Sequence, residues 1–362
     1  MRRASLPPPR RVADPALERP IRRIQSTDAV SATLRGKIAA TDHRGPDGLE
    51  HRPLPGPRPA RPRHRRLFHP VTGWFRRFER TAEHLLSTHV YPLVPGLPFV
   101  YSRALERHLT LVEGDVAIAG LPAGFDGARV LLITDVHLGP FLSPPALERV
   151  FARLLSADPD LVLLGGDLTT AKIDEFPAGA AAFRSLRAPL GVFAVLGNHD
   201  HYTGHPERLR GLLADCGVRV LHNSAVSLET PGGPDGDPAR LVVAGIDDLH
   251  AGSPDLDAAL AQASPGAPVV LLSHNPDVVF GAARRGVRLV LSGHTHGGQI
   301  RIPGLPVLVR MSRYRLDEGH YVAGATHLIV SRGLGVTGLP VRLFCPPEAV
   351  LITLRRASSP SA

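Results

Sequence analysis

Cysteine, lysine and aromatic residues are scarce in this 362-residue sequence, and long apolar runs are absent. The two cysteines, Cys216 and Cys345, lie far apart and match no metal-binding spacing, which favours buried free thiols over a disulfide framework. No run of about 18 apolar residues occurs, so the sequence predicts no transmembrane helix. Lysine occurs only at Lys37 and Lys172, and arginine therefore carries nearly all of the positive charge.

Positive charge is concentrated at the start of the chain. Residues 1–80 contain 19 basic and 7 acidic side chains, whereas the remaining residues contain 23 basic and 26 acidic ones. The body of the protein is thus close to neutral, which argues against a nucleic-acid partner. Arg2-Arg3 is not followed by an apolar segment of the kind found in export signals, so we expect a cytoplasmic protein.

Composition divides the chain into four parts. Residues 1–66 are rich in Pro and Arg and have no hydrophobic periodicity, so we predict a disordered leader. Residues 67–105 are expected to hold an amphipathic helix and a linker, residues 106–356 a catalytic domain, and residues 357–362 a disordered tail.

The helix predicted at residues 71–87 has an aromatic face, which includes Trp74 and Phe78, and an arginine-rich face. One interpretation is that this helix packs on the catalytic domain. The alternative is that residues 70–90 and the basic leader contact an anionic membrane peripherally, from its cytoplasmic side. The sequence makes no prediction of the oligomeric state.

The body alternates strands with helices. Strands are predicted at residues 109–118, 129–134, 160–164, 191–196, 218–221, 226–228, 241–246, 269–272, 287–291, 307–310, 321–323, 327–330, 341–344 and 350–354. Helices are predicted at residues 144–157, 176–186, 206–216 and 255–263. Alternating strands and helices indicate an α/β fold with a largely parallel sheet, and the strand-rich end of the chain indicates a second sheet packed against it.

Polar side chains that can bind metals follow five of these strands. In chain order they are Asp135 and His137, Asp167, Asn198 and His199, His274, and finally His294 and His296. Because the carboxyl ends of strands line the binding crevice in open α/β sheets, we expect these side chains to converge.

The chemistry of this set indicates a site for two metal ions. Seven nitrogen and oxygen ligands exceed what one tetrahedral ion takes, and imidazole with carboxylate suits Mn, Fe or Zn. Two such ions roughly 3.5–4 Å apart activate a bridging water for in-line attack on phosphorus. A leaving oxygen also needs a proton, and we predict that His199 is the general acid, with Asp200 positioned to orient or charge it.

The motifs Asp135-x-His137, Gly166-Asp167, Gly197-Asn198-His199-Asp200, His274 and Gly293-His294-Thr295-His296 resemble, in order, the five blocks of the calcineurin-like metallophosphoesterase superfamily. The sequences around His274, from Ser292 to Gln299 and from Ser331 to Gly335 are similar to those of a bacterial branch of YkuE- and YaeI-like phosphohydrolases.

This resemblance implies a four-layer αββα sandwich, in which two mixed sheets are flanked by helices. It also implies that Asp167 bridges two divalent metal ions. The remaining ligands would be Asp135, His137 and His296 for the first ion, and Asn198, His274 and His294 for the second.

Several polar residues near the motifs have competing interpretations. Arg332 and His201 are candidates for substrate contact, with a structural salt bridge and a solvated loop as the alternatives. Asp247 follows a strand and is expected to cap a turn. The glycine pattern from Gly333 to Gly338 matches a dinucleotide fingerprint, but no helix is predicted after it, so we reject that interpretation.

The leading functional hypothesis is a phosphodiesterase with some phosphomonoesterase activity. A hydrolase of a lipid-linked or nucleotide pyrophosphate at the membrane surface is an alternative. No lid insertion is visible of the kind that some lipid-A-pathway hydrolases of the superfamily carry. A non-catalytic scaffold is disfavoured because every ligand position is filled. A nuclease is disfavoured because the body lacks an evident basic, aromatic groove.

Overall fold

The computed structural model describes residues 49–61, 85–230, 239–307 and 309–357 of the chain. All of them belong to one compact unit. Most of the predicted leader, nearly all of the helix predicted at residues 71–87 and the tail from residue 358 lie outside the described residues. Within the described part, none of the helices has the length and apolar character needed to cross a membrane.

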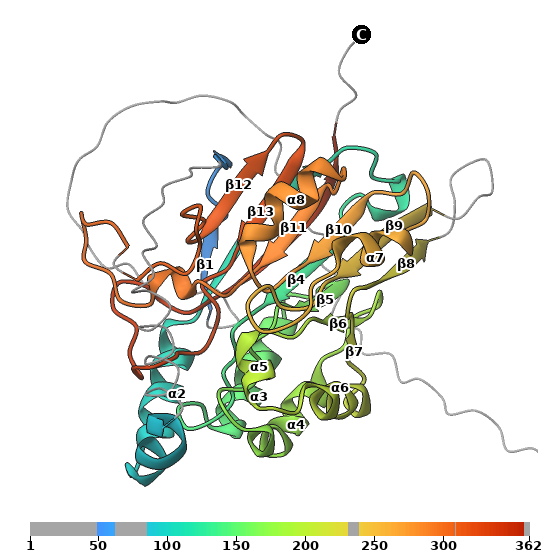
Figure 1. Ribbon diagram of the computed structural model, residues 1–362. Helices are drawn as coiled ribbons and strands as arrows, with labels where there is room; N and C mark the ends of the chain where they lie inside the picture. The colour runs from blue at the N-terminus through green and yellow to red at the C-terminus, as the bar shows by residue number, and fades with distance from the viewer. Residues whose placement is uncertain (1–48, 62–84, 231–238, 308, 358–362) are drawn as a thin grey trace, which may run out of the picture. The chain divides into compact units, whose positions relative to one another are not determined.

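Two seven-stranded mixed sheets form the centre of the fold (Figure 1). The first sheet has the strand order β1 (Glu50–Pro53), β3 (Thr110–Ile118), β14 (Glu348–Arg356), β4 (Arg129–Ile133), β5 (Leu161–Leu164), β6 (Val192–Ala194) and β7 (Arg219–Val220). The second has the order β2 (Arg58–Pro59), β12 (Gly319–Ala323), β13 (Thr326–Val330), β11 (Leu289–Ser292), β10 (Val269–Leu272), β9 (Ala239–Gly245) and β8 (Ser224–Thr230).

Each sheet contains four neighbouring parallel strands with an antiparallel strand beside them. Strands β4 to β7 run parallel, while β14 pairs antiparallel with β4. Strands β9, β10, β11 and β13 likewise run parallel, while β8 and β12 pair antiparallel at either side. The carboxyl ends of the parallel strands therefore carry the loops in which the predicted ligands occur.

Alternation of side chains along the strands divides the hydrophobic core into layers. In β4, Val130 and Leu132 pack between the two sheets, whereas Leu131 and Ile133 pack under the helices of the first sheet. Successive strand side chains point to opposite faces, and both faces of a central strand are covered, so the strand reads as a continuous apolar run.

Helices cover the outer face of each sheet. The first sheet packs against α2 (Leu97–His108), α3 (Pro144–Leu155), α4 (Phe176–Ser185) and α6 (Pro206–Asp215). The second packs against α7 (Leu256–Ala261) and α8 (Val279–Arg284). Figure 1 shows the resulting order of helices, sheet, sheet and helices, which confirms the predicted four-layer αββα sandwich.

Four local predictions are wrong. Residues 50–59, expected in a disordered leader, supply β1 and β2, because their main chains complete the edges of the two sheets. Residues 91–103, expected to be a linker, include η2 (Tyr91–Leu93) and most of α2, which Tyr101 and Leu105 anchor in the core. Residues 341–344 form an isolated bridge to Ile300 and no strand, and the described residues around 309 form no strand.

Candidate metal centre

The seven predicted ligands come from loops of both sheets. Asp135, His137, Asp167 and Asn198 follow β4, β5 and β6 of the first sheet, and His274, His294 and His296 follow β10 and β11 of the second. All seven are buried. Main-chain hydrogen bonds hold the first two loops together, since Asp135 N–H donates to Gly166 O at 2.9 Å and His137 N–H donates to Asp167 O at 3.0 Å.

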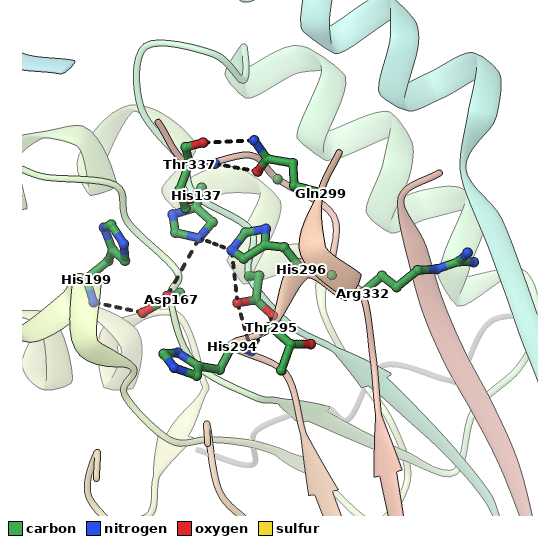
Figure 2. A network of polar contacts seen from close by, with 12 residues as sticks. His137, Asp167, His199, His294, Thr295, His296, Gln299, Arg332 and Thr337 are labelled. Carbon is green, nitrogen blue, oxygen red and sulfur yellow. Dashed lines mark hydrogen bonds and ion pairs between the residues drawn. The ribbon is translucent and has the colours of Figure 1, made fainter. Parts of the chain in front are cut away.

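One group of possible ligand atoms lies around the ring of His137 (Figure 2). His137 Nε2 is 3.1 Å from His296 Nε2 and 3.6 Å from Asp167 Oδ2, and His296 Nε2 is 3.4 Å from Asp135 Oδ1. The second group shares Asp167. Its Oδ2 is 3.1 Å from His274 Nε2, which is 3.2 Å from His294 Nδ1.

This donor set fits divalent metal ions. Pairs of imidazole nitrogens face each other at 3.1 and 3.2 Å, and two neutral lone pairs repel at that distance unless a proton or a cation lies between them. Asn198 Oδ1 is buried and accepts no hydrogen bond within the described structure. A buried amide oxygen without a donor is costly, and a cation would satisfy it.

The pKa values of three of the four histidine ligands favour cation binding, whereas the raised pKa values of Asp135 and His274 mean that a cation would displace a proton from each. Burial, reinforced by neighbouring imidazoles, holds the pKa values of His137, His294 and His296 well below the ordinary value, so these rings stay neutral. Burial raises the pKa of Asp135 to about 6. Although burial opposes it, the Asp167 carboxylate raises the pKa of His274 well above its ordinary value. Neutral imidazoles are the form that binds metals.

Glycines let the ligand loops approach each other. A Cβ atom on Gly293 would clash with Asp135 Oδ2, and one on Gly197 would clash with Asp167 Oδ1. Gly333, whose φ of 72° suits glycine, leaves a hypothetical Cβ only 2.5 Å from Asp135 Cβ. The glycine pattern that begins at Gly333 therefore packs against the ligands, which agrees with the rejection of a dinucleotide site.

His199 lies beside the cluster without joining either group of ligand atoms. Its ring is half-buried, and its centroid is 4.8 Å from that of His137. Its Nδ1 is 2.8 Å from Thr170 O, and since a carbonyl only accepts, Nδ1 is the donor. Its main-chain N–H donates to Asp167 Oδ1 at 2.8 Å, which couples the His199 loop to the shared ligand.

The contacts of Asp200 differ from the prediction that it orients His199. Its carboxylate accepts hydrogen bonds from the main-chain N–H groups of Leu168, Thr169 and Gly197 at 2.9 to 3.0 Å. It therefore fixes the loop after β5 against the start of α5 (Asn198–Tyr202), and the Thr170 carbonyl orients the His199 ring instead.

The two candidates for substrate contact are engaged by other side chains. Arg332 forms a buried ion pair with Glu348 at 2.5 Å, and Figure 2 shows its side chain directed away from the histidines. The salt bridge that the structural interpretation of Arg332 expects is thus present. His201 Nε2 is 2.7 Å from Asp247 Oδ1, so it is not a solvated loop residue. Asp247 also accepts from Ser253 N–H at 2.7 Å, as expected for a turn cap.

Sequence reasoning missed two residues next to the centre. The guanidinium of Arg342 lies 3.3 Å from His296 Nδ1 and donates to Gly335 O at 2.6 Å. The ring of His250 lies with its centroid 4.9 Å from that of His294. Neither residue lies in a motif at the end of a strand, so nothing in its local sequence indicated a position next to the metal centre.

Comparison with known proteins places these motifs in a family. A family model described as calcineurin-like phosphoesterase matches residues 128–298, which include all seven predicted ligands. The uncharacterized metallophosphoesterase YkuE of Bacillus subtilis is 33% identical over 267 residues, which cover 73% of this chain and 92% of YkuE. An uncharacterized metallophosphoesterase of Aquifex aeolicus is 32% identical over 263 residues, which cover 70% of this chain and 95% of that protein.

A longer relative occurs in zebrafish. The Danio rerio protein named transmembrane protein with metallophosphoesterase domain is 31% identical over 256 residues. The aligned region covers 68% of this chain but 57% of the zebrafish protein, so the two share little more than half of that relative's length.

Proposed function

Since this chain belongs to the family of calcineurin-like phosphoesterases and is a hydrolase of phosphoric ester bonds, we propose that it holds two divalent metal ions and hydrolyses a phosphate diester, with some monoesterase activity. The observation that carries the proposal is the position of Asp167, which belongs to both groups of ligand atoms. One carboxylate shared by two sets of imidazoles is the arrangement that two neighbouring cations need.

Asp135, His137 and His296 would complete the first metal site, and Asn198, His274 and His294 the second. The imidazole and carboxylate donors suit Mn, Fe or Zn. When bound, the pair of ions supplies Lewis acidity for the phosphoryl oxygens and activates a water molecule as the nucleophile.

His199 would donate the proton to the leaving oxygen. Its Nδ1–H is fixed by the Thr170 carbonyl at 2.8 Å, so Nε2 is the atom that takes up and gives the proton. The hydrogen bond from its main-chain N–H to Asp167 fixes the position of His199 relative to the shared ligand. General acids of this kind contribute about 10²–10⁴-fold to the rate.

The test is hydrolysis of bis-p-nitrophenyl phosphate by the full chain after loading with Mn²⁺. We expect Asp167→Ala to lose turnover and bound metal together, as measured by elemental analysis. His199→Ala should lose about 10²–10⁴-fold in turnover and keep its metal. His205→Ala, at an exposed histidine before α6, is the control that should keep both. Inactivity of the fully metallated protein would contradict the proposal, and loss of metal from His199→Ala would remove the acid role.

A lipid-linked phosphate ester is the second candidate substrate, and a pocket at the loop after β4 favours it. The pocket has a volume of about 270 Å³ and is lined chiefly by apolar residues, among them Leu138, Leu142 and Ala178. Leu138 directly follows the predicted ligand His137 along the chain, which connects the lining of the pocket to the ligand loop after β4. The zebrafish relative is named a transmembrane protein with a metallophosphoesterase domain, which is consistent with this class of substrate.

Matched alkyl substrates test the pocket. Methyl and dodecyl p-nitrophenyl phosphate share the reacting group, so their kcat/KM ratio reports on the apolar part alone. We expect Ala178→Phe to lower kcat/KM for the dodecyl ester only, because the new ring fills the pocket. Ala181→Phe, an exposed alanine of the same helix that does not line the pocket, is the control. Equal effects of both variants would contradict this assignment.

A further inference from the structure

Exposed large hydrophobic side chains gather in one part of the surface. Among the described residues, all of them fall in the segments 85–100, 302–309 and 339–344, and the most exposed are Leu93 at 78% and Phe344 at 65%. Single exposed hydrophobic side chains are common on proteins, whereas contiguous groups mark surfaces that bind a partner. We call these three segments the apolar rim.

Hydrogen bonds make the apolar rim continuous. Tyr91 Oη donates to Gly338 O at 2.5 Å, which connects the first segment to the start of the third. Arg301 N–H donates to Leu343 O at 2.9 Å, and Leu343 N–H donates to Gln299 O at 3.1 Å, which connects the second segment to the third. In Figure 1, α2 and the loops that follow β11 and β13 accordingly meet on the same side of the sheets.

The apolar rim also borders the metal centre. Arg342, between exposed residues of the third segment, donates to Gly335 O at 2.6 Å and lies 3.3 Å from His296 Nδ1. Gln299, which binds the third segment, is only three residues beyond His296. A partner on the rim would therefore lie close to the predicted ligand His296.

The charge of these segments indicates the kind of partner. The three segments of the apolar rim contain no aspartate or glutamate and one arginine, Arg342. Arg301, Arg310, Arg313 and Arg315 lie beside the second segment, and Arg301 and Arg310 form ion pairs with Glu318 and Asp317. Arg313 and Arg315 are exposed, so their charge is available at the surface. Apolar side chains flanked by arginines suit the interface of an anionic bilayer. A second copy of the chain fits poorly, because two such surfaces would bring like charges together.

We propose that the apolar rim docks this protein on an anionic phospholipid bilayer. Leucine and phenylalanine side chains of the rim enter the outer acyl region, and the exposed arginines contact lipid phosphate groups. The metal centre then faces the lipid–water interface. The proposal rests on exposed residues outside the catalytic site, and its test does not depend on turnover.

The test is flotation of the full chain with vesicles of phosphatidylcholine, with and without phosphatidylglycerol. The triple variant F99S/L305S/F344S removes one exposed side chain from each segment. We expect wild type to float with anionic vesicles and the triple variant to partition at least about tenfold less, because each buried Leu or Phe contributes that order of affinity. Binding by wild type should weaken with salt without disappearing, since only the arginine contribution is screened.

The control R208S/A214S/D215S places three serines on exposed sites of α6 and leaves the net charge unchanged. It should float like wild type, and both triple variants should keep the wild-type circular dichroism spectrum, which shows that they fold. As a second measurement, vesicles should protect the amides of all three rim segments from hydrogen exchange in wild type. Equal flotation of wild type and F99S/L305S/F344S would overturn the proposal. The proposal would also be overturned if wild type formed a dimer, F99S/L305S/F344S were a monomer, and vesicles bound neither protein.

Discussion

Single residues at the metal centre adopt backbone conformations that most side chains avoid. Five of the seven predicted ligands have left-handed φ angles, namely Asp135 (51°), His137 (49°), Asp167 (51°), His294 (71°) and His296 (50°). Each such conformation costs on the order of 1–3 kcal/mol and persists only where the surroundings impose it. Here the main-chain bonds between the ligand loops and the close-packed glycines impose it, so the centre is preorganised by the fold.

Gly197→Ala tests this dependence on close packing. Gly197 has a φ of −103°, which alanine adopts without strain, so the clash of Cβ with the carboxylate and main-chain nitrogen of Asp167 would act alone. We expect the displaced carboxylate to weaken Mn²⁺ binding about 10–100-fold in a calorimetric titration.

The same substitution at Gly211 is the matched control. Gly211 lies in α6, and a Cβ atom there meets no other atom within 4 Å. Gly211→Ala should therefore leave Mn²⁺ affinity unchanged and raise the free energy of unfolding by about 0.5–1 kcal/mol. Equal Mn²⁺ affinity in both variants would show that the centre tolerates movement of Asp167.

The pair of His201 and Asp247 gives a pH dependence to stability. The hydrogen bond to Asp247 raises the pKa of His201 above its ordinary value, and His201 in turn holds the pKa of Asp247 below its own, although burial opposes the latter shift. The stabilisation by a raised histidine pKa is complete below the unfolded value of about 6.5 and is lost as the pH rises through the folded value. The stabilisation from Asp247 is present above about pH 4 and is lost in more acidic solution.

His201→Leu should therefore lower the free energy of unfolding most at about pH 5.5, by about 1.5–3 kcal/mol, since a hydrogen bond between charged groups is lost. The difference from wild type should shrink as the pH rises through the raised pKa of His201 in the folded protein. Urea unfolding of both proteins across this range measures it. A difference that stays constant with pH would mean that the pair is not ionised in the folded protein.

At the level of elements, β14 shows why strand positions were predictable and strand order was not. Its apolar residues Val350, Ile352 and Leu354 mark a strand in the sequence and lie in the core between the sheets. The sequence placed it in a second sheet with its neighbours in the chain. In the structure it lies between β3 and β4, because pairing depends on distant main chains that leave no local pattern. Residues 341–344, which include Arg342, were wrongly predicted to be a strand. Their apolar and basic residues resemble a short strand, but whether they pair depends on distant main chains.

The ion pair between Arg332 and Glu348 joins β14 to the loop after β13. Both side chains are buried, and Glu348 also accepts from Arg332 N–H at 2.9 Å. Removing one partner leaves a buried charge, so Glu348→Leu or Arg332→Met should each lower the free energy of unfolding by about 3–5 kcal/mol. The double variant R332M/E348L should lose much less than the sum, as measured by urea unfolding.

The exposed pair of Arg285 and Asp257, at 2.6 Å, is the control for that cycle. Asp257→Asn should change stability little, because solvent screens the pair. Activity separates the two interpretations of Arg332. If Arg332→Met folds stably and has a raised KM for phosphate esters, that result would support the interpretation of Arg332 as a substrate contact.

For the whole molecule, the metal centre is a link between the two sheets. The predicted ligands Asp135, His137, Asp167 and Asn198 belong to loops of the first sheet, and His274, His294 and His296 to loops of the second. The sequence predicted this convergence because every ligand occurs at the end of a strand. It could not predict that two sheets share the site, since the motif order is the same for one sheet or two.

Metal binding should therefore stabilise the molecule as well as activate it. An ion that binds only the folded state stabilises it by about 4 kcal/mol when its free concentration is a thousandfold above Kd. We expect EDTA to lower the Tm of the full chain and Mn²⁺ to restore it. His199→Ala should show the wild-type shift, because the His199 ring lies outside both groups of ligand atoms. Asp167→Ala should lose most of the shift, because Asp167 belongs to both groups. If Mn²⁺ raised the Tm of Asp167→Ala as much as that of wild type, the stabilising ions would bind elsewhere, and the shared carboxylate would lose its central place in the proposed function.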